Sequence, residues 1–324
     1  MEIKKREEIV IVGSGIAGLT AGIYTSRAGY EPLIISGNSR GGQTAETHDI
    51  ENYPGFKDAI SGFELMGNTE AQAVKYGSRM LSGEVVDFDL SDEDNKKVIL
   101  RDGTEIVADS IIFATGASPR KTGLQSELDF AGRGVSYCAV CDGNFYRGKK
   151  VAVLGGGNSA VGEALYLSNI ASEVYLIHRG EEFNRAEKVF VDQLYETKNI
   201  KIIKNSGIKE VLGDAMGVNA VVVGHEDSND AEKIEVDGLF VAIGKVPNTS
   251  SLEGKVDLKP GGYVKTEGQS TETNVEGFFV AGDIASPFQQ IVIAAGQAAV
   301  AAIECQEYLS KKGVAPVKES TGAY

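Results

Sequence analysis

Short apolar runs that lead directly into glycine-rich turns recur along the 324-residue chain. Residues 8–12 predict a short buried strand, and the turn Gly13–Gly18 (Gly-Ser-Gly-Ile-Ala-Gly) follows it. A helical pattern covers residues 19–28, and a second buried strand covers residues 33–35. A strand, a helix and a second strand in this order predict a βαβ unit whose two strands run parallel.

The rest of the first segment mixes loop, helix and hairpin patterns. Residues 37–56 are rich in Gly, Asn, Thr and Pro and predict an extended loop, and residues 61–77 predict a helix. Residues 84–90 predict a strand, which an acidic turn and a hairpin with Asp102-Gly103 at its tip follow. The segment closes with the apolar run and glycine of residues 111–116.

The same order of patterns then appears a second time. Residues 151–154 predict a strand, Gly155–Ala160 (Gly-Gly-Gly-Asn-Ser-Ala) form a second glycine turn, and residues 161–168 predict a helix. A strand over residues 174–177 and β-rich stretches lead to the closing run 239–244. Two copies of one architecture, each with a β-hairpin insertion, are therefore predicted.

The last part of the chain does not start a third copy. It contains a predicted strand over residues 262–265, an apolar run at 278–283 and a long helix from about 290 to 309. We infer that this part completes the first domain, so that the second copy is inserted into it, and that the two crossing strands form a hinge. The fold class expected is α/β, with two Rossmann-like three-layer nucleotide-binding domains. The expected boundaries are 1–117 and 247–324 for the first domain and 118–246 for the inserted one.

Composition and charge exclude several classes of protein. Apolar residues make up 42% and charged residues 24% of the chain, which is typical of globular domains and excludes general disorder. The 46 acidic residues exceed the 32 basic ones, so nucleic acid is an unfavourable partner. No apolar run approaches the length of about 18 residues that a membrane span needs. The apolar stretch 9–12 is too short for a secretory signal, so we expect a cytoplasmic protein without membrane contact.

The two glycine turns indicate nucleotide binding. A glycine turn between a strand and a helix lets a pyrophosphate approach backbone N–H groups at the helix N-terminus. Gly13, Gly15 and Gly18 fit this pattern, and Gly155, Gly157 and Ala160 fit its variant with alanine in third place. One such turn could be an ordinary tight turn, but two copies predict two dinucleotide sites.

The strand that follows each turn distinguishes the two nucleotides. The first of these strands ends in Ser36-Gly37 and lacks the usual ribose-binding acid. The second ends in His178-Arg179, and an arginine at this place can bind the 2′-phosphate of NADPH. The alternative is a solvated loop charge, because Glu181 and Glu182 follow closely.

Cys138 and Cys141 form a CxxC sequence, which has three interpretations. A closed zinc site needs four ligands, and Cys305 and three scattered histidines do not supply them at ligand spacing, so no metal is expected. Two idle buried thiols are the second interpretation. The favoured one is a redox pair, because cysteines three apart can close a small disulfide. Asp142 could shuttle a proton at the thiol or simply cap a helix, and we expect Cys305 to serve packing alone.

Two nucleotide sites and one CxxC suggest a path for electron pairs. Nicotinamide delivers a hydride, a flavin can accept it, and a dithiol exchanges electron pairs at sulfur. The predicted order is nicotinamide, flavin, disulfide and an external acceptor.

The chain resembles bacterial-type low-molecular-weight thioredoxin reductases over nearly its whole length. The most specific likeness is the CxxC-Asp-Gly run placed just before the second glycine turn. The matching stretches are Gly13–Gly18, Gly41-Gly42-Gln43, residues 51–55, Ala114-Thr115-Gly116, residues 132–136, Cys138–Gly143, Gly155–Ala160, residues 247–249 and Ala281-Gly282-Asp283.

The resemblance implies cofactors, roles and an assembly. The first domain would bind FAD and the inserted domain NADPH, and the protein would be a homodimer that swings the NADPH domain. Cys141 would lie nearer the flavin, Cys138 would attack the thioredoxin disulfide, and Asp142 would be the acid. The contacts expected in the first domain are Gly13, Ser14, Gly15, Ile16, Ala17, Gly18, residues 36–43 (Ser36, Gly37, Gly41, Gly42 and Gln43 above all), Asn52, Val86, Ala114, Thr115, Gly116, Gly282, Asp283, Gln289, Gln290 and Ile291. Those expected in the inserted domain are Gly155, Gly157, Asn158, Ser159, Ala160, His178, Arg179, Arg185, Ile243 and Gly244.

Three positions depart from the family pattern. The phosphate-binding run usually reads His-Arg-Arg with a later Arg, whereas residues 178–185 lack the second Arg and carry one extra residue. Arg179 and Arg185 remain, so NADPH is expected and the use of NADH stays open. Gln289 replaces a common arginine, and Lys245-Val246 replace a common histidine.

Other functions compete with this one. A flavin reductase that uses NADH or serves a peroxiredoxin-type protein is the main alternative, although peroxiredoxin-linked relatives usually carry an added N-terminal redox domain. Ferredoxin-linked relatives lack the CxxC. A non-catalytic nucleotide sensor would not need it.

Overall fold

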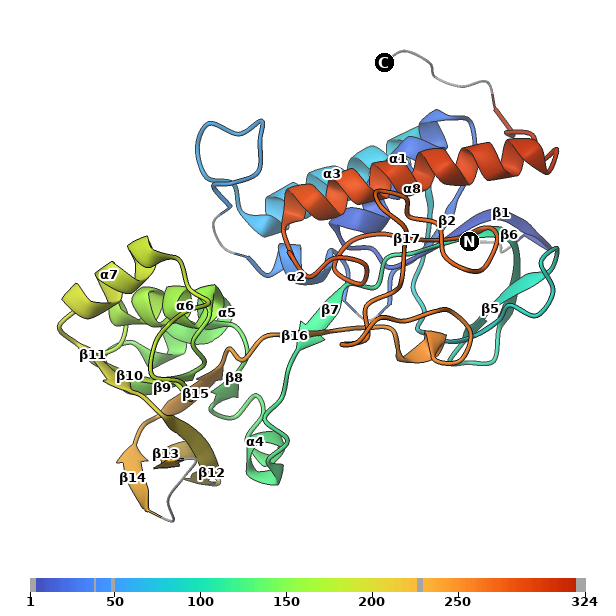
Figure 1. Cartoon of the computed structure of the whole chain (residues 1–324). Helices are drawn as coiled ribbons and strands as arrows, with labels where there is room; N and C mark the ends of the chain where they lie inside the picture. The colour runs from blue at the N-terminus through green and yellow to red at the C-terminus, as the bar shows by residue number, and fades with distance from the viewer. Residues whose placement is uncertain (1–3, 38, 48–49, 226–229, 319–324) are drawn as a thin grey trace. The chain divides into compact units, whose positions relative to one another are not determined.

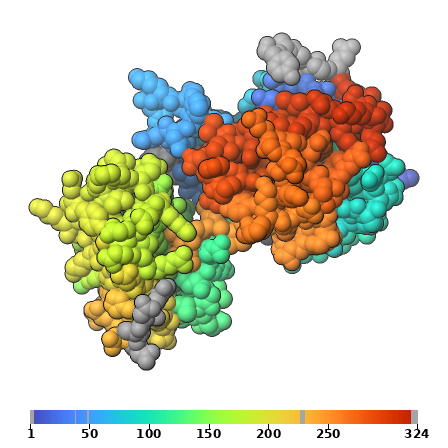
Figure 2. Space-filling model, viewed as in Figure 1, coloured from blue at the N-terminus to red at the C-terminus, as the bar shows by residue number. Residues whose placement is uncertain are grey.

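The computed structural model describes residues 4–37, 39–47, 50–225 and 230–318, which fold into two compact units. Unit 1 consists of Met1–Ala117 and Pro247–Tyr324, and unit 2 consists of Ser118–Val246. The two pieces of unit 1, blue to cyan and orange to red, interleave in one body (Figure 2). The two connections between the units pair with each other as a two-stranded sheet of β7 (Ala117–Pro119) and β16 (Lys245–Pro247).

The core of unit 1 is a seven-stranded sheet with the order β3-β2-β1-β6-β5-β4, in which β17 pairs with β6. Parallel pairing joins β3, β2, β1, β6 and β17, while β4, β5 and β6 pair antiparallel. These strands are β1 (Glu7–Val12), β2 (Leu33–Ile35), β3 (Arg79–Leu81), β4 (Val85–Asp89), β5 (Lys96–Leu100), β6 (Glu105–Phe113) and β17 (Phe278–Val280).

Helices cover one face of this sheet, as Figure 1 shows. Alternate residues of β1 divide between the two faces, because successive side chains of a strand point in opposite directions. Ile9 and Ile11 pack under the helices, while Val10 and Val12 pack on the other face with β4, β5 and η2. The helical elements of unit 1 are α1 (Ile16–Arg27), α2 (Gly42–Ala45), α3 (Gly62–Tyr76), η2 (Ser250–Leu252) and α8 (Ile291–Lys311).

Unit 2 repeats the plan with a five-stranded parallel sheet in the order β11-β10-β9-β15-β8. Helices cover one face, and a three-stranded antiparallel sheet of β12, β13 and β14 packs on the other. The strands are β8 (Val135–Ser136), β9 (Lys150–Leu154), β10 (Glu173–Ile177), β11 (Ile200–Ile203), β12 (Ser206–Asp214), β13 (Gly217–His225), β14 (Ala231–Glu235) and β15 (Gly238–Val241). The helical elements are α4 (Gln125–Asp129), α5 (Ala139–Asp142), η1 (Gly143–Tyr146), α6 (Asn158–Ser168) and α7 (Lys188–Glu196).

The α/β class with two Rossmann-like folds is confirmed, two local predictions are corrected, and one short strand had no prediction. Residues 262–265 form no strand; Val264 only bridges Leu258, because glycines at 261 and 262 turn the chain there. The predicted loop 37–56 contains the short helix α2. Strand β3 was not predicted, since it has only three residues and each is half-buried. Within the described residues, no helix has the length and apolarity required to span a membrane.

Candidate functional site

The first glycine turn lies where the strand order of unit 1 reverses direction. The chain runs from β1 to β2 on one side, and β6 pairs with β1 on the other. Such a switch point opens a crevice at the carboxyl ends of parallel strands, where ligands of α/β folds bind. Gly13, Ser36, Ala114 and Ala281 each follow directly on the last residue of β1, β2, β6 or β17 at this edge.

The geometry of the turn requires glycine at two places and leaves space at a third. Gly13 has a φ of 113°, and a Cβ there would lie 2.3 Å from the Ala114 carbonyl oxygen. A Cβ on Gly18 would lie 1.9 Å from the Gly13 carbonyl oxygen. A Cβ on Gly15 would meet nothing within 4 Å, so the backbone at the start of α1 is open to a close-approaching phosphate.

Other predicted first-domain residues gather around this turn. The Ser14 hydroxyl donates to the Ser36 carbonyl at 3.3 Å, and a Cβ on Gly42 would lie 3.4 Å from Gly15 Cα. A Cβ on Gly282 would lie 3.1 Å from the Ala17 Cβ. The loop after β2, the first residue of α2 and the loop after β17 therefore meet the N-terminus of α1, and Ile16 is the first residue of that helix.

The Thr115 and Asn248 groups fasten the two pieces of unit 1 to each other. The Thr115 hydroxyl donates to the Asn248 carbonyl at 2.8 Å, and the Asn248 amide donates to the Thr115 carbonyl at 2.9 Å. Gly116, next in the chain, has a φ of 69° and open space at its Cβ. Asp283 follows Gly282 after β17.

A second group of predicted contacts lies at the start of α8. The Asn52 amide donates to the Gln290 side chain at 3.2 Å, and Gln290 caps the helix that Ile291 begins. Gln289 has a φ of 46°, which is unusual for a residue other than glycine. The Gln43 amide donates to the Ala117 carbonyl.

For three further described residues predicted in the first domain, the structure gives no contact with the glycine turn. Val86 lies exposed on β4, which β5 and β6 separate from β1 in the sheet order. Gly37 and Gly41 both have positive φ, at 64° and 79°. Asn38, inside the predicted range 36–43, lies outside the described residues.

The second glycine turn reproduces the first at the switch point of unit 2. The Gly155 N–H donates to the Ile177 carbonyl at 3.0 Å, as that of Gly13 does to the Ile35 carbonyl at 2.8 Å. A Cβ on Gly155 would lie 2.3 Å from the Ala242 carbonyl oxygen, the same separation that Gly13 has from Ala114. Gly157 again has open space.

The loop after β10 wraps around this second turn. A Cβ on Gly156 would lie 2.0 Å from the His178 ring, so the imidazole packs directly under the turn. The ring also stacks on Phe183 with centroids 4.8 Å apart. Arg185 forms a backbone bridge with Gly157, while Arg179 is exposed. The loop therefore places Arg185 beside the glycine turn.

The first turn of α6 and the loops near it hold the remaining second-unit predictions. The Asn158 amide donates to Glu187 at 3.1 Å, and the Glu187 N–H donates back at 2.6 Å. Ser159 is exposed and Ala160 is buried. Ile243 and Gly244 follow β15, and the Gly244 carbonyl accepts from the Arg120 N–H at 2.8 Å.

Cys138 and Cys141 are joined by a disulfide at the start of α5, with Cα atoms 5.4 Å apart. Cys138 is half-buried and Cys141 is exposed. The Cys141 N–H donates to Cys138 Sγ at 3.2 Å, and the Asp142 N–H donates to the Cys138 carbonyl at 3.2 Å. The disulfide is therefore accessible at Cys141, and a backbone donor faces the sulfur of Cys138.

Comparisons with known proteins agree with this arrangement. The family model described as pyridine nucleotide-disulphide oxidoreductase matches residues 7–299. The chain is 43% identical over 328 residues to the thioredoxin reductase of Escherichia coli, with 98% of this chain and 100% of that protein covered. It is 41% identical over 316 residues to the thioredoxin reductase of Vibrio cholerae, covering 95% and 98% respectively. The chain belongs to the pyridine nucleotide-disulphide oxidoreductase family.

Solved structures extend the likeness to three dimensions. The thioredoxin reductase of Lactococcus lactis matches with a TM-score of 0.87 and 34% identity, covering 94% of this chain and 99% of that one. That of T. acidophilum matches with a TM-score of 0.84 and 31% identity, covering 95% and 100%. These relatives confirm the predicted resemblance and an oxidoreductase of the thioredoxin reductase type.

Two buried carboxyl groups in unit 2 of this family member were not predicted from the sequence. Glu127 is fully buried and accepts hydrogen bonds from the Thr122 N–H at 2.7 Å and the Tyr137 hydroxyl at 2.8 Å. Glu163 lies on α6 and accepts a hydrogen bond from the Ala139 N–H. A signal for Glu163 existed, because it stands beside the apolar positions 160, 164 and 167 of one helix face.

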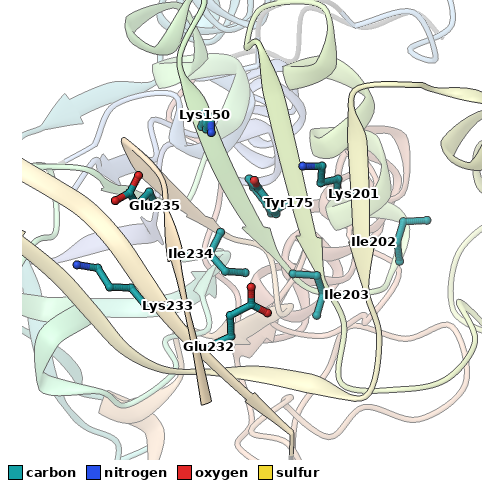
Figure 3. Close-up of a pocket in the computed structure, with 9 residues that line it drawn as sticks. All are labelled: Lys150, Tyr175, Lys201, Ile202, Ile203, Glu232, Lys233, Ile234 and Glu235. Carbon is teal, nitrogen blue, oxygen red and sulfur yellow. The ribbon is translucent and has the colours of Figure 1, made fainter. Parts of the chain in front are cut away.

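Unit 2 also contains a cavity of about 620 Å³ away from the nucleotide turn. It lies between β14 and the face of β9, β10 and β11 that the helices do not cover. Figure 3 shows five charged side chains around Tyr175 and Ile234. Its three lysines (150, 201 and 233) and two glutamates (232 and 235) nearly balance, and the predicted cofactor contacts in the described chain are not among its lining residues.

Proposed function

We propose that this protein reduces the disulfide of thioredoxin with electrons from NADPH, by way of bound FAD and the Cys138–Cys141 disulfide. We further propose that it acts as a cytoplasmic homodimer. The observation that carries the proposal is an accessible disulfide in a chain with two glycine turns of matching geometry. The names of its relatives support thioredoxin as the acceptor.

In this proposal unit 1 holds FAD. The open backbone at Gly15 and the N-terminus of α1 favour a pyrophosphate, because unpaired N–H groups and the helix dipole both attract negative charge. The Asn52–Gln290 pair and Thr115 offer side-chain groups on the loops that surround the turn. FAD, when bound, would supply two-electron chemistry between a hydride donor and a disulfide.

In this proposal unit 2 holds NADPH. Gly157 leaves the same open approach at the N-terminus of α6, and Arg179 and Arg185 supply positive charge for a 2′-phosphate. The neighbouring glutamates are engaged elsewhere, since Glu181 accepts from the Asn205 amide and Glu182 accepts from Lys204 at 3.4 Å. Lys204 offsets part of the negative charge of Glu182, and the hydrogen bond from Asn205 holds the Glu181 side chain.

The two cysteines and Asp142 would perform the thiol chemistry. Cys138 would attack the disulfide of thioredoxin, and the Cys141 N–H, which already donates to its sulfur, would stabilise a thiolate there. Cys141 would then close the disulfide again. Asp142 would move the proton at the thiols.

Replacement of Cys138 tests the function. In Cys138→Ser we expect no thioredoxin reduction, while NADPH still bleaches the flavin absorbance at a normal rate. The matched control is Cys305→Ser, because Cys305 is buried against the Ser110 hydroxyl at 3.1 Å, and a serine there can keep that hydrogen bond. This control should reduce thioredoxin normally. Full thioredoxin turnover by Cys138→Ser would refute the proposed path.

A further inference from the structure

The carboxyl group of Glu163 contacts the backbone between the two cysteines. Glu163 is on α6, and the N–H of Ala139, the residue after Cys138, donates to it. The Ala139 side chain is buried in the same cluster as Ala160, Ala164 and Leu167 of α6. The segment between the two cysteines is thus held against α6 both by apolar contact and by this hydrogen bond.

The second oxygen of this carboxyl group is not satisfied. Among the residues that the structure describes, Glu163 Oε2 is buried and has no hydrogen-bond partner. A buried carboxylate without full hydrogen bonding is costly, because its negative charge loses hydration that nothing replaces. The protonated acid carries no net charge and avoids most of this cost. The surroundings of this carboxyl group therefore favour its protonated form.

Burial accordingly raises the pKa of Glu163 to about 7, although the Ala139 N–H and the charge of Lys245 on β16 both act to lower it. On α5 the sulfurs are closed in the disulfide and carry no charge. Asp142 and Tyr146, which follow the disulfide, interact with each other, and the pKa of Tyr146 is raised by burial and by Asp142. Reduction would add a new titratable pair, the two thiols, next to Glu163.

We propose that Glu163 is a positioning residue that holds the Cys138–Cys141 segment and couples its reduction to uptake of a proton. The inference rests on the proposed redox role of the two cysteines. Reduction breaks the S–S bond with two electrons and, when both sulfurs become thiols, two protons. If one sulfur stays a thiolate, its charge opposes the Glu163 carboxylate through the shared backbone segment. The carboxyl group then takes up a proton from solvent.

The direction of the pH effect follows from this coupling. With the disulfide closed, Glu163 loses its proton near pH 7, and with one sulfur reduced to a thiolate it keeps the proton to a higher pH. At a pH between the pKa of Glu163 in the disulfide form and its higher pKa in the reduced form, reduction consumes one additional proton. Reduction therefore becomes less favourable as the pH rises through this range. The effect on the equilibrium constant is about tenfold for each unit by which reduction raises the pKa.

The test equilibrates the anaerobic holoenzyme with mixtures of reduced and oxidised dithiothreitol from pH 6 to 9. The Cys138 and Cys141 thiols are alkylated and counted by mass spectrometry. We expect wild type and Glu163→Gln to have similar equilibrium constants for disulfide reduction at pH 6. Above pH 7 the two constants should separate, and that of wild type should be lower by about tenfold for each unit by which reduction raises the pKa of Glu163. Glu163→Met is the second neutral variant and should follow Glu163→Gln.

Glu196→Gln is the matched control, because Glu196 is exposed on α7 of the same unit and the change removes the same charge. It should follow wild type. A constant ratio between wild type and the neutral Glu163 variants over the whole pH range would overturn the inference. Because dithiothreitol reduces the pair directly, this result does not depend on whether NADPH and thioredoxin are the true substrates.

Discussion

At the scale of single residues, the positive charge of Arg179 and Arg185 determines the expected nucleotide preference. Replacing Arg179 by alanine removes a charged group that can hydrogen-bond the 2′-phosphate, and such bonds contribute about 1.5–3 kcal/mol. We expect the KM for NADPH to rise about 10- to 100-fold and the KM for NADH to stay the same, measured by steady-state flavin reduction. Arg185→Ala should act in the same direction.

Lys198→Ala provides the control, since Lys198 is an exposed cation of the same unit outside the 178–187 loop. It should leave both constants unchanged. Equal KM values for NADPH and NADH in the wild-type protein would show that the two arginines do not recognise the 2′-phosphate.

Sequence patterns could predict the glycines, the CxxC and the two arginines as candidates, because each proposed chemistry depends on neighbours in the chain. They could not identify Glu127 as a buried acid. Its burial depends on Thr122, Tyr137 and the packing of α4 against β12, which no local pattern encodes. Glu163 is an intermediate case, because only contact with Ala139 on α5 turns a helical acid into a buried group near the disulfide.

At the scale of elements, a substitution in the Gly15 turn before helix α1 should weaken cofactor binding without affecting folding. A Cβ at Gly15 meets no protein atom within 4 Å, and the residue has a φ of −70°, so alanine fits without strain. The added methyl group would instead occupy the open approach to the backbone. We expect Gly15→Ala to fold normally and to bind FAD at least about tenfold more weakly, measured by flavin release and rebinding.

Gly67→Ala is the matched control in the same unit. Gly67 lies exposed in α3, and a Cβ there also meets nothing within 4 Å. Alanine should stabilise this helix by about 0.5–1 kcal/mol without any change in FAD affinity. An unaltered flavin affinity in Gly15→Ala would argue against a pyrophosphate at this turn.

The elements that the sequence predicts well are those whose periodicity spans many residues or whose turn is specific. Helices α3 and α8 and strand β2 fall within one or two residues of expectation. Helices α1 and α6 begin three residues before their predicted starts, because the glycine turn itself contributes their first turn. The short elements α2 and β3 depend on neighbours far away in the chain, for β3 the pairing with β2.

At the scale of the whole molecule, the chain contains two copies of one architecture that differ in sequence at the nucleotide-selecting position. In both turns the first glycine packs closely against a carbonyl group that follows a neighbouring strand. A Cβ added to that glycine would lie 2.3 Å from the carbonyl oxygen. The copies differ in the loop after the second strand, which is Ser36-Gly37 in unit 1 and His178-Arg179 in unit 2. We infer that the common turn provides pyrophosphate binding and that the loops select the nucleotide.

This division predicts where each nucleotide protects the backbone. On adding NADP⁺ to the oxidised holoenzyme, we expect slower amide hydrogen exchange at residues 155–160 and 178–185, because bound phosphates occupy N–H groups and restrict local opening. Residues 13–18 should exchange at an unchanged rate, since in the proposed function their turn is already occupied by FAD in the holoenzyme. NAD⁺ at the same concentration should protect 178–185 less, because it lacks the 2′-phosphate. Equal protection of both turns by NADP⁺ would mean that the two copies do not divide the nucleotides in this way.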